Sequence, residues 1–315
     1  MTGLLKGARV AVRTCMGVKR GERVLVVTDP PRLTIARSLL EAAREAGANA
    51  ILLCMPVGKR HGEEPPKLVG VAMLSSDVVL APTTYSISHT QARLRATRSG
   101  VRIATMPMIT EDIMSSGAML ADYREVSRLT EKVAAELRGV KTVEITTGAG
   151  TELVFSIAGR RICPDTGIYR RPGDFGNLPA GEVAVAPVEG TAEGQVVIDG
   201  SMMDRVHGKI KISFKHGVAK KISGKGASKL IRVLDSAGPF SRNLAEFGIG
   251  TNPKARLIGN VLEDEKVLGT CHIALGDHST FGGKVKAGVH VDGIFTKPTV
   301  RLDGKILMEN GRLMV

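Results

Sequence analysis

Histidine and carboxylate side chains with the spacing of a metal site lie near the end of the chain. The segment Gly269–Asp292 carries three of the seven histidines and ends in His290-Val291-Asp292. Alternate side chains of a β-strand share one face, roughly 6.5–7 Å apart, so His290 and Asp292 can converge on one cation. With His272 they form a two-histidine, one-carboxylate set, which suits Zn, Mn, Co or Fe(II) better than Ca or Mg.

Three glutamates stand in settings that are unusual for surface charge. Glu182 leads directly into the apolar run Val183–Pro187, Glu246 has apolar neighbours on both sides, and Glu265 lies just before the histidine segment. A buried carboxylate is costly unless it is paired or bound to a metal. Any one of the three could be a surface or hydrogen-bonded carboxylate. Together with the histidines and Asp292, they have the types and number needed to hold two cations and a bridging water for metal-assisted hydrolysis.

Strands alternating with helices occupy the first part of the chain. Apolar runs at 23–29, 48–55, 76–81 and 101–105 predict strands, and helical spacing is found between them, as in Leu33–Ala46. This alternation predicts a doubly wound parallel sheet. Ligands of such sheets bind beyond the carboxyl ends of the strands, where Asp29, Thr84 and His89 lie. A histidine in the first turn of a helix, such as His89, is more often a packing or capping residue than a substrate contact.

The pattern changes after a long amphipathic helix at 125–138. Lys141–Ile157 predicts a hairpin, and short Val/Ile/Thr runs broken by glycine continue to the end, with one evident helix near 227–234. We therefore expect an α/β protein with an N-terminal parallel-sheet domain at 1–140 and a mainly antiparallel α+β metal-binding domain at 141–315. Three glycine-rich pieces lack the arrangement of a dinucleotide or P-loop motif, so no nucleotide cofactor is expected.

Composition narrows the class of protein. The chain has 315 residues, 43% of them apolar and 24% charged, which is typical of globular proteins. Its four cysteines form no C-x-x-C pair, as expected in a reducing cytoplasm. The N-terminus is not typical of a signal peptide, and no apolar run reaches the roughly 18 residues of a membrane span. Nucleic acid is not an expected partner, because the net charge of +13 comes with few aromatic residues for base stacking.

Four motifs, in this order, carry a resemblance to a known family. They are Pro-x-Gly-Glu182-Val-x-x-Ala-Pro, Glu246-x-Gly-x-Gly-x-Asn-Pro, Glu265-Lys…Gly-Thr-x-His272-Ile-Ala-Leu-Gly, and His290-x-Asp292. The set resembles the aminopeptidase T family of thermophilic metallo-aminopeptidases, over residues 170–315 and more loosely before them.

This resemblance implies a homodimer that removes N-terminal residues from short peptides, using two divalent metals per chain (Zn, Co or Mn) and a metal-bound hydroxide. It assigns the metal ligands to Glu182, Glu246, Glu265, His272, His290 and Asp292. The spacing from Glu265 to His272 is longer than is usual in the family.

One departure supports an alternative. The peptidases carry a tyrosine shortly after the motif histidine, whereas this chain has Asp277-His278-Ser279-Thr280-Phe281. Either His278 or Ser279 would then take the catalytic role, or the peptidase activity would be absent. Ring-cleaving dioxygenases acting on dihydroxypyridines resemble the same family but use one non-heme Fe(II), for which His272, His290 and Asp292 would suffice. The glutamates favour the aminopeptidase as the main prediction. A basic binding protein without turnover is a third alternative.

Overall fold

The first of two structural units is built on a parallel sheet. A computed structural model describes residues 2–315, and this unit comprises the residues up to Ser127 together with Thr166–Ala180. The strand order is β2-β1-β3-β4-β8, and every neighbouring pair is parallel. The strands are β1 (Arg23–Thr28), β2 (Asn49–Cys54), β3 (Val78–Thr83), β4 (Arg102–Pro107) and β8 (Phe175–Asn177).

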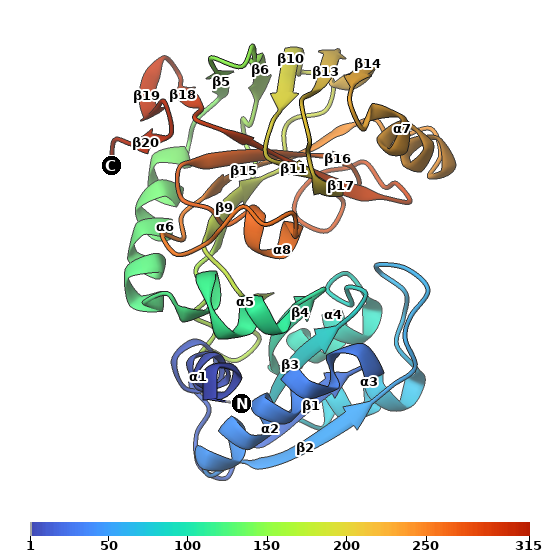
Figure 1. Ribbon diagram of the computed structural model, residues 1–315, viewed down its shortest axis with the longest axis vertical. Helices are drawn as coiled ribbons and strands as arrows, with labels where there is room; N and C mark the ends of the chain where they lie inside the picture. The colour runs from blue at the N-terminus through green and yellow to red at the C-terminus, as the bar shows by residue number, and fades with distance from the viewer. Residues whose placement is uncertain (1) are drawn as a thin grey trace. The chain divides into compact units, whose positions relative to one another are not determined.

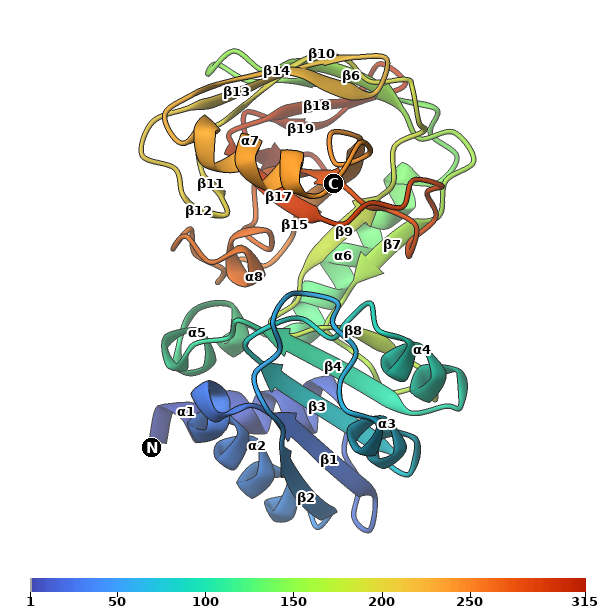
Figure 2. The ribbon, with the colours of Figure 1, turned by 90° about the vertical axis from the view of Figure 1, so that its right-hand side faces the viewer.

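Helices cover both faces of this sheet. Figure 2 shows α1 and α2 on one side and α3 and α4 on the other. Leu25, Val79 and Ile103 of the strands form a core with Met73 of α3 and Ala96 of α4. The helical segments are α1 (Thr2–Arg9), η1 (Val10–Cys15), η2 (Pro30–Arg32), α2 (Leu33–Glu45), α3 (Lys67–Leu74), α4 (Gln91–Arg98), α5 (Glu111–Ser115) and η3 (Gly117–Leu120). The predicted doubly wound arrangement is confirmed.

The second unit contains two antiparallel sheets. It comprises Arg128–Asp165 and Gly181–Val315. The eight-stranded sheet has the order β14-β13-β10-β6-β5-β18-β19-β20. Its strands are β5 (Thr142–Thr146), β6 (Glu152–Ser156), β10 (Glu193–Ile198), β13 (Ile210–Lys215), β14 (Val218–Gly224), β18 (Thr299–Leu302), β19 (Lys305–Glu309) and β20 (Arg312–Leu313). The predicted hairpin corresponds to β5 and β6, which pair antiparallel.

The seven-stranded sheet carries the candidate site. Its order is β12-β11-β17-β16-β15-β9-β7. Its strands are β7 (Ile162–Asp165), β9 (Glu182–Val185), β11 (Ser201–Met202), β12 (Asp204–Arg205), β15 (Leu244–Gly250), β16 (Thr270–Gly276) and β17 (His290–Thr296). Three helices accompany the two sheets, namely α6 (Tyr123–Leu137), which begins in the first unit, α7 (Ala227–Ser236) and α8 (Val261–Asp264).

The two sheets of the second unit enclose one hydrophobic core. Figure 1 shows the eight-stranded sheet above the seven-stranded one, with α6 and α7 beside them. Phe155 of β6 meets Phe247 of β15 edge-on, with ring centroids 5.4 Å apart. Val133 of α6 and Leu230 of α7 belong to the same core. One face of the seven-stranded sheet is therefore apolar, which leaves its other face for polar side chains.

One strand of the first unit was not predicted from the sequence, and the predicted domain boundary is not tested by the fold. The short strand β8 lies in the segment 166–180 and pairs with β4 in the first unit, and it is not predicted by the sequence pattern. Phe-Gly-Asn has no apolar run to mark a strand. The domain boundary near residue 140 stays a prediction, because contacts within a chain do not show which part folds alone.

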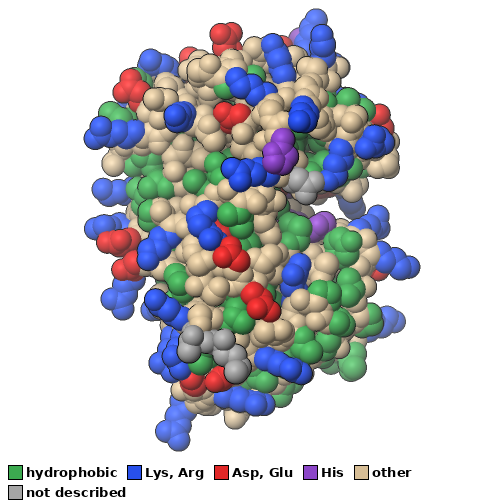
Figure 3. Space-filling model, in the orientation of Figure 1, with side chains coloured by type: hydrophobic (Ala, Val, Ile, Leu, Met, Phe, Trp, Pro, Cys, Tyr) green, Lys and Arg blue, Asp and Glu red, His purple; other side chains and the backbone are tan. Residues whose placement is uncertain are grey.

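The surface offers no concentrated basic stripe on the face that Figure 3 shows. Lys and Arg side chains are spread over this face among acidic and apolar residues. Within residues 2–315, no helix is both long and apolar enough to cross a membrane.

Candidate metal centre

Strand periodicity places the predicted metal ligands on one face of the seven-stranded sheet. Cys271 and Ile273 of β16 lie in the hydrophobic core, so His272 between them points to the opposite face. On β17, Val291 lies in the core, and its neighbours His290 and Asp292 therefore face the same side as His272.

Small residues between the strands make room for these side chains. Ala274 of β16 is the register partner of both Glu246 on β15 and Asp292 on β17, so only a methyl group separates the two carboxylates along this row. In the next row, Gly248 pairs with His272. A Cβ at Gly248 would collide with the His272 imidazole, so the ring lies over β15 only because residue 248 is glycine.

The ligand atoms lie close enough to share a cation. His272 Nε2 is 3.3 Å from Glu182 Oε2 and 3.5 Å from Glu246 Oε1. His290 Nε2 is 3.0 Å from Glu246 Oε2 and 3.3 Å from Asp292 Oδ1. Three overlapping groups could each hold a metal ion, and they bring together all six predicted ligands: Glu182, Glu246 and His272; Glu246, His290 and Asp292; and Glu265, His272 and Asp292.

Buried polar atoms without partners show that the cluster fits a cation. His272 is fully buried; its Nδ1 has no hydrogen-bond partner, and its Nε2 has only the long contacts to Glu182 and Glu246, which do not have hydrogen-bond geometry. Glu182 Oε2 is likewise buried without one. Such atoms are rare in folded proteins because each loses its hydration without compensation. A divalent metal would satisfy the lone pairs of the imidazole and of the carboxylate oxygen together.

The close packing of acids and imidazoles shifts their protonation. Burial opposes charge on His272, but Glu246 and the other carboxylates outweigh it and raise the pKa of His272 to about 9. Burial likewise opposes charge on His290, yet Asp292 and Glu246 hold its pKa well above the usual value. Burial raises the pKa of Glu265 to about 8 despite the adjacent Lys266. In the metal-free protein, protons on these histidines and on Glu265 therefore take the place that a metal ion would occupy.

A backbone carbonyl orients His290. His290 Nδ1 lies 2.7 Å from the carbonyl oxygen of Asp277. A carbonyl can only accept, so Nδ1 carries the proton and Nε2 is left to face Glu246 and Asp292. The carboxylate of Asp277 accepts hydrogen bonds from the backbone N–H groups of Ser279 and Ala287, at 2.9 and 2.8 Å, and so holds both ends of the loop after β16. Sequence reasoning did not identify Asp277 as a positioning residue.

His278 and Ser279 belong to this loop. His278 is fully buried, with Nε2 3.4 Å from Glu189 Oε1 and Nδ1 accepting from the backbone N–H of Val285 at 3.3 Å. Ser279 Oγ donates to Asp277 Oδ1 at 2.8 Å. Neither residue is part of the three metal groups. Their contacts organise the loop, and their predicted catalytic role stays a prediction.

Lys266 is a further member of the cluster that sequence reasoning missed. Its side chain is fully buried, and its Nζ contacts Glu182 Oε1 at 2.5 Å and also Glu265 Oε1. Burial opposes the charge, but the two carboxylates raise the pKa of Lys266 above its usual value. The available signal was its position beside the predicted ligand Glu265. It was missed because a run of acidic residues that ends in lysine normally lies on a solvated surface.

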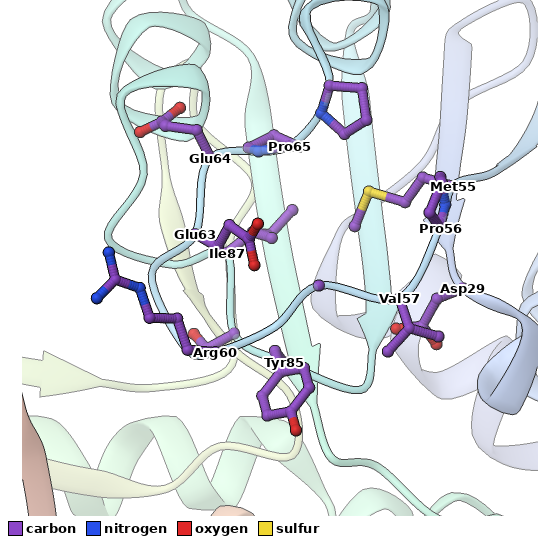
Figure 4. A pocket seen from close by; sticks show the side chains of 13 residues that line it. Asp29, Met55, Pro56, Val57, Arg60, Glu63, Glu64, Pro65, Tyr85 and Ile87 are labelled. Atoms are coloured by element: carbon purple, nitrogen blue, oxygen red, sulfur yellow. The ribbon is translucent and has the colours of Figure 1, made fainter.

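A separate pocket of about 210 Å³ lies in the first unit. Figure 4 shows Asp29, Met55, Arg60, Glu63, Tyr85 and Ile87 among its lining residues. Asp29 follows β1 at the edge where parallel sheets bind ligands. Its carboxylate, however, already accepts from the N–H and hydroxyl of Thr84, at 2.7 and 3.0 Å, which ties the two strand ends together. His89 is exposed. The unpartnered ligand atoms of the metal cluster make the second unit the stronger candidate site.

Comparison with known proteins decides between the enzyme classes. The family model described as 2,5-dihydroxypyridine 5,6-dioxygenase (NicX) matches residues 5–315. The chain belongs to this dioxygenase family. The solved structure of 2,5-dihydroxypyridine dioxygenase from Pseudomonas putida KT2440 is similar, with a TM-score of 0.83 and 19% identity over 99% of this chain and 97% of that one. No curated protein matches the chain.

A second solved structure accounts for the aminopeptidase prediction. Wild-type AmpT from Thermus thermophilus is similar with a TM-score of 0.76 and 21% identity, over 100% of this chain and 99% of that chain. At these identities both structures establish the fold alone. The resemblance to aminopeptidase T was therefore right about the fold and wrong about the activity. Membership of the dioxygenase family points to an oxidoreductase, and it overturns the predicted hydrolase, aminopeptidase and metalloprotease.

The reason for this error is physical. The four motifs specify strands that carry histidines and carboxylates on one face, and that arrangement serves a metal without specifying the reaction. The absent tyrosine in Asp277–Phe281 was the feature that pointed to the dioxygenase.

Proposed function

We propose that the protein is a dioxygenase that uses one Fe(II) to open a hydroxylated pyridine ring, with 2,5-dihydroxypyridine as the first substrate to test. Membership of the dioxygenase family supports the reaction class. The printed name of the family and of its structural relative supports the substrate class. The name also indicates the bond: cleavage between ring carbons 5 and 6, with both atoms of dioxygen retained in the open-chain product.

One observation supports the ligand set. Asp292 lies within reach of each histidine, because it shares one metal group with His272 and another with His290. Two imidazoles meeting at a common carboxylate form the two-histidine, one-carboxylate set that non-heme Fe(II) oxygenases use. Under this proposal His272, His290 and Asp292 hold the iron, and Glu246 lies beside it between the two imidazoles.

The bound iron would supply the one-electron chemistry that allows dioxygen to react with an aromatic ring. The residues of the chain position the ligand atoms and leave an opening through which a substrate can reach the centre. The proton on His290 Nδ1, held by the Asp277 carbonyl, keeps Nε2 available as a ligand. His272 is fully buried, whereas the side chain of His290 is 29% exposed, so the centre opens to solvent beside His290. Phe281 packs edge-on to the His290 ring there, with centroids 6.0 Å apart, and offers an apolar surface for a flat substrate.

Oxygen uptake coupled to ring loss tests the proposal. The metal-free protein is loaded with Fe(II) without oxygen and then mixed with 2,5-dihydroxypyridine and air-saturated buffer. We expect one dioxygen to be consumed for each ring whose ultraviolet absorbance is lost. Protein loaded with Zn(II), which has no redox chemistry, is the matched control. Ring loss without oxygen uptake, or equal rates with Zn(II), would contradict the proposal, as would no turnover across a panel of hydroxylated pyridines.

A further inference from the structure

The loop between β16 and β17 carries Phe281 to the metal centre. We propose that Glu189, which lies outside the metal cluster, is a positioning residue that holds this loop and so sets the Phe281 wall of the substrate site. The inference deepens the proposed function and rests on it for the identity of the substrate. The position of the loop can be measured without any turnover.

The carboxylate of Glu189 contacts the loop at two points. Its Oε1 accepts a hydrogen bond from the backbone N–H of Lys284 at 2.7 Å. The Nε2 atom of the buried His278 lies 3.4 Å from the same oxygen. Glu189 belongs to the connection between β9 and β10, so a segment far from the loop in the chain supplies this carboxylate.

Arg160 completes the attachment from a third segment, the turn between β6 and β7. Its guanidinium contacts Glu189 and donates to the carbonyl oxygens of Gly282, at 2.5 Å, and Pro187, at 3.2 Å. Only 10% of the Arg160 side chain is exposed, so these charged hydrogen bonds are stronger than they would be in water. Burial opposes the charge of Glu189, but backbone N–H groups, including that of Lys284, and Arg160 outweigh it and hold the pKa of Glu189 below its usual value.

The interior of the loop transmits this hold to Phe281. The carbonyl oxygen of His278 accepts from Gly283 N at 2.9 Å and from Phe281 N at 3.4 Å, which closes a turn around Phe281. A Cβ at Gly283 would lie 2.0 Å from His278 Nδ1, so the backbone of the turn rests on the imidazole. The Phe281 ring meets the His290 ring edge-on, with centroids 6.0 Å apart. A displacement of the attached backbone therefore moves Phe281 relative to the metal centre.

Loss of Glu189 should affect substrate binding more than metal binding. The proposed iron ligands His272, His290 and Asp292 lie on β16 and β17, where strand pairing holds them, whereas Phe281 lies on the loop. A carboxylate that acts only on the loop changes the wall of the site and leaves the ligand atoms on their strands.

A double-mutant cycle tests whether Glu189 acts through Phe281. Binding of 2,5-dihydroxypyridine to the Fe(II)-loaded protein is titrated without oxygen, and Fe(II) affinity is measured by competition with a chelator. We expect Glu189→Gln and Phe281→Leu each to weaken substrate binding by roughly 2–10-fold, as for the loss of one aromatic contact. The double variant should lose no more than Phe281→Leu alone, because no ring is left to be positioned. Fe(II) affinity should stay unchanged in all three.

A fluorescent reporter follows the loop independently of the substrate. The chain has no tryptophan, so Phe281→Trp places a single indole at the position in question. Adding Glu189→Gln should shift its emission to the red and speed its quenching by acrylamide, since the released loop exposes the ring. Glu131→Gln, which removes a carboxylate from an exposed ion pair with Arg138, is the matched control and should change neither the emission nor substrate affinity.

The outcomes separate the inference from the proposed function. Unchanged emission in a folded Glu189→Gln, or additive losses of substrate affinity in the cycle, would overturn the inference. If Glu189→Gln does not fold, hydrogen exchange in the native protein decides, since the backbone N–H of Lys284 should exchange slowly and fast exchange would overturn the inference. A native protein that binds and opens no hydroxylated pyridine would refute the proposed function, while the reporter still decides whether Glu189 holds the loop.

Discussion

At the scale of single residues, Asp292 and Glu182 should respond differently to loss of charge. Asp292 is within reach of both histidines, whereas Lys266 already holds Glu182. We expect Asp292→Asn to weaken Fe(II) binding by more than the roughly 10–100-fold that outer-shell partners typically cost. Glu182→Gln should stay within that range. Competition with a coloured chelator measures both affinities, and the exposed Asp235→Asn is the control. Equal losses for the two variants would show that Asp292 is not the central carboxylate.

Protons and metal compete for the same imidazoles, which fixes the sign of the pH dependence. With a pKa raised to about 9, His272 is protonated near neutral pH in the metal-free protein, and the pKa of His290 is raised as well. Iron binds only the neutral ring, so affinity should rise with pH up to about 9 and fall in acid, by about tenfold per pH unit for each proton displaced. Calorimetry in buffers of different ionisation enthalpy counts the protons. An affinity that is flat between pH 6 and 8 would contradict this prediction.

The residue scale also shows what a sequence can reveal. His290-Val291-Asp292 could be assigned to one face because the two-residue period of a strand is fixed by geometry. Lys266 and Asp277 could not be assigned in this way. Their roles depend on which distant groups the folded chain brings to them: Glu182 for Lys266, and His290 Nδ1 for the Asp277 carbonyl.

At the scale of elements, β15 must come close to β16 without a side chain at residue 248. We expect Gly248→Ala to push the His272 ring out of place, to destabilise the second unit by about 1–3 kcal/mol and to weaken metal binding by roughly tenfold or more. Gly148→Ala is the matched control, since a Cβ there meets nothing within 4 Å. Thermal melting and metal titration report the two effects. Unchanged metal affinity in a folded Gly248→Ala would show that the ring can move without consequence.

Elements were predictable where a local pattern was strong. The helix expected at Leu33–Ala46 is α2 at Leu33–Glu45, and the expected hairpin is β5 with β6. β8 was missed because three residues carry no periodicity, and it is a strand only through its pairing with β4. The order of strands in the seven-stranded sheet could not be predicted either. It brings β9, β15, β16 and β17 side by side from segments far apart in the chain.

At the scale of the whole molecule, fold and metal chemistry were predictable and the reaction was not. Histidines and carboxylates on one sheet face indicate a metal, but they leave open whether it activates water or dioxygen. The family match over residues 5–315 supplies that distinction. The predicted homodimer stays a prediction.

The fate of the oxygen atoms tests the central claim most directly. The Fe(II)-loaded protein is incubated with 2,5-dihydroxypyridine under ¹⁸O₂, and the product is analysed at once by mass spectrometry. Opening of the ring by a dioxygenase leaves both atoms of one dioxygen in the product, so we expect a mass increase corresponding to two ¹⁸O atoms per molecule, before any exchange with water. A ring-opened product without ¹⁸O, which gains the label only when the reaction is repeated in H₂¹⁸O under ordinary oxygen, would show that the metal activates water and would contradict the proposed dioxygenase.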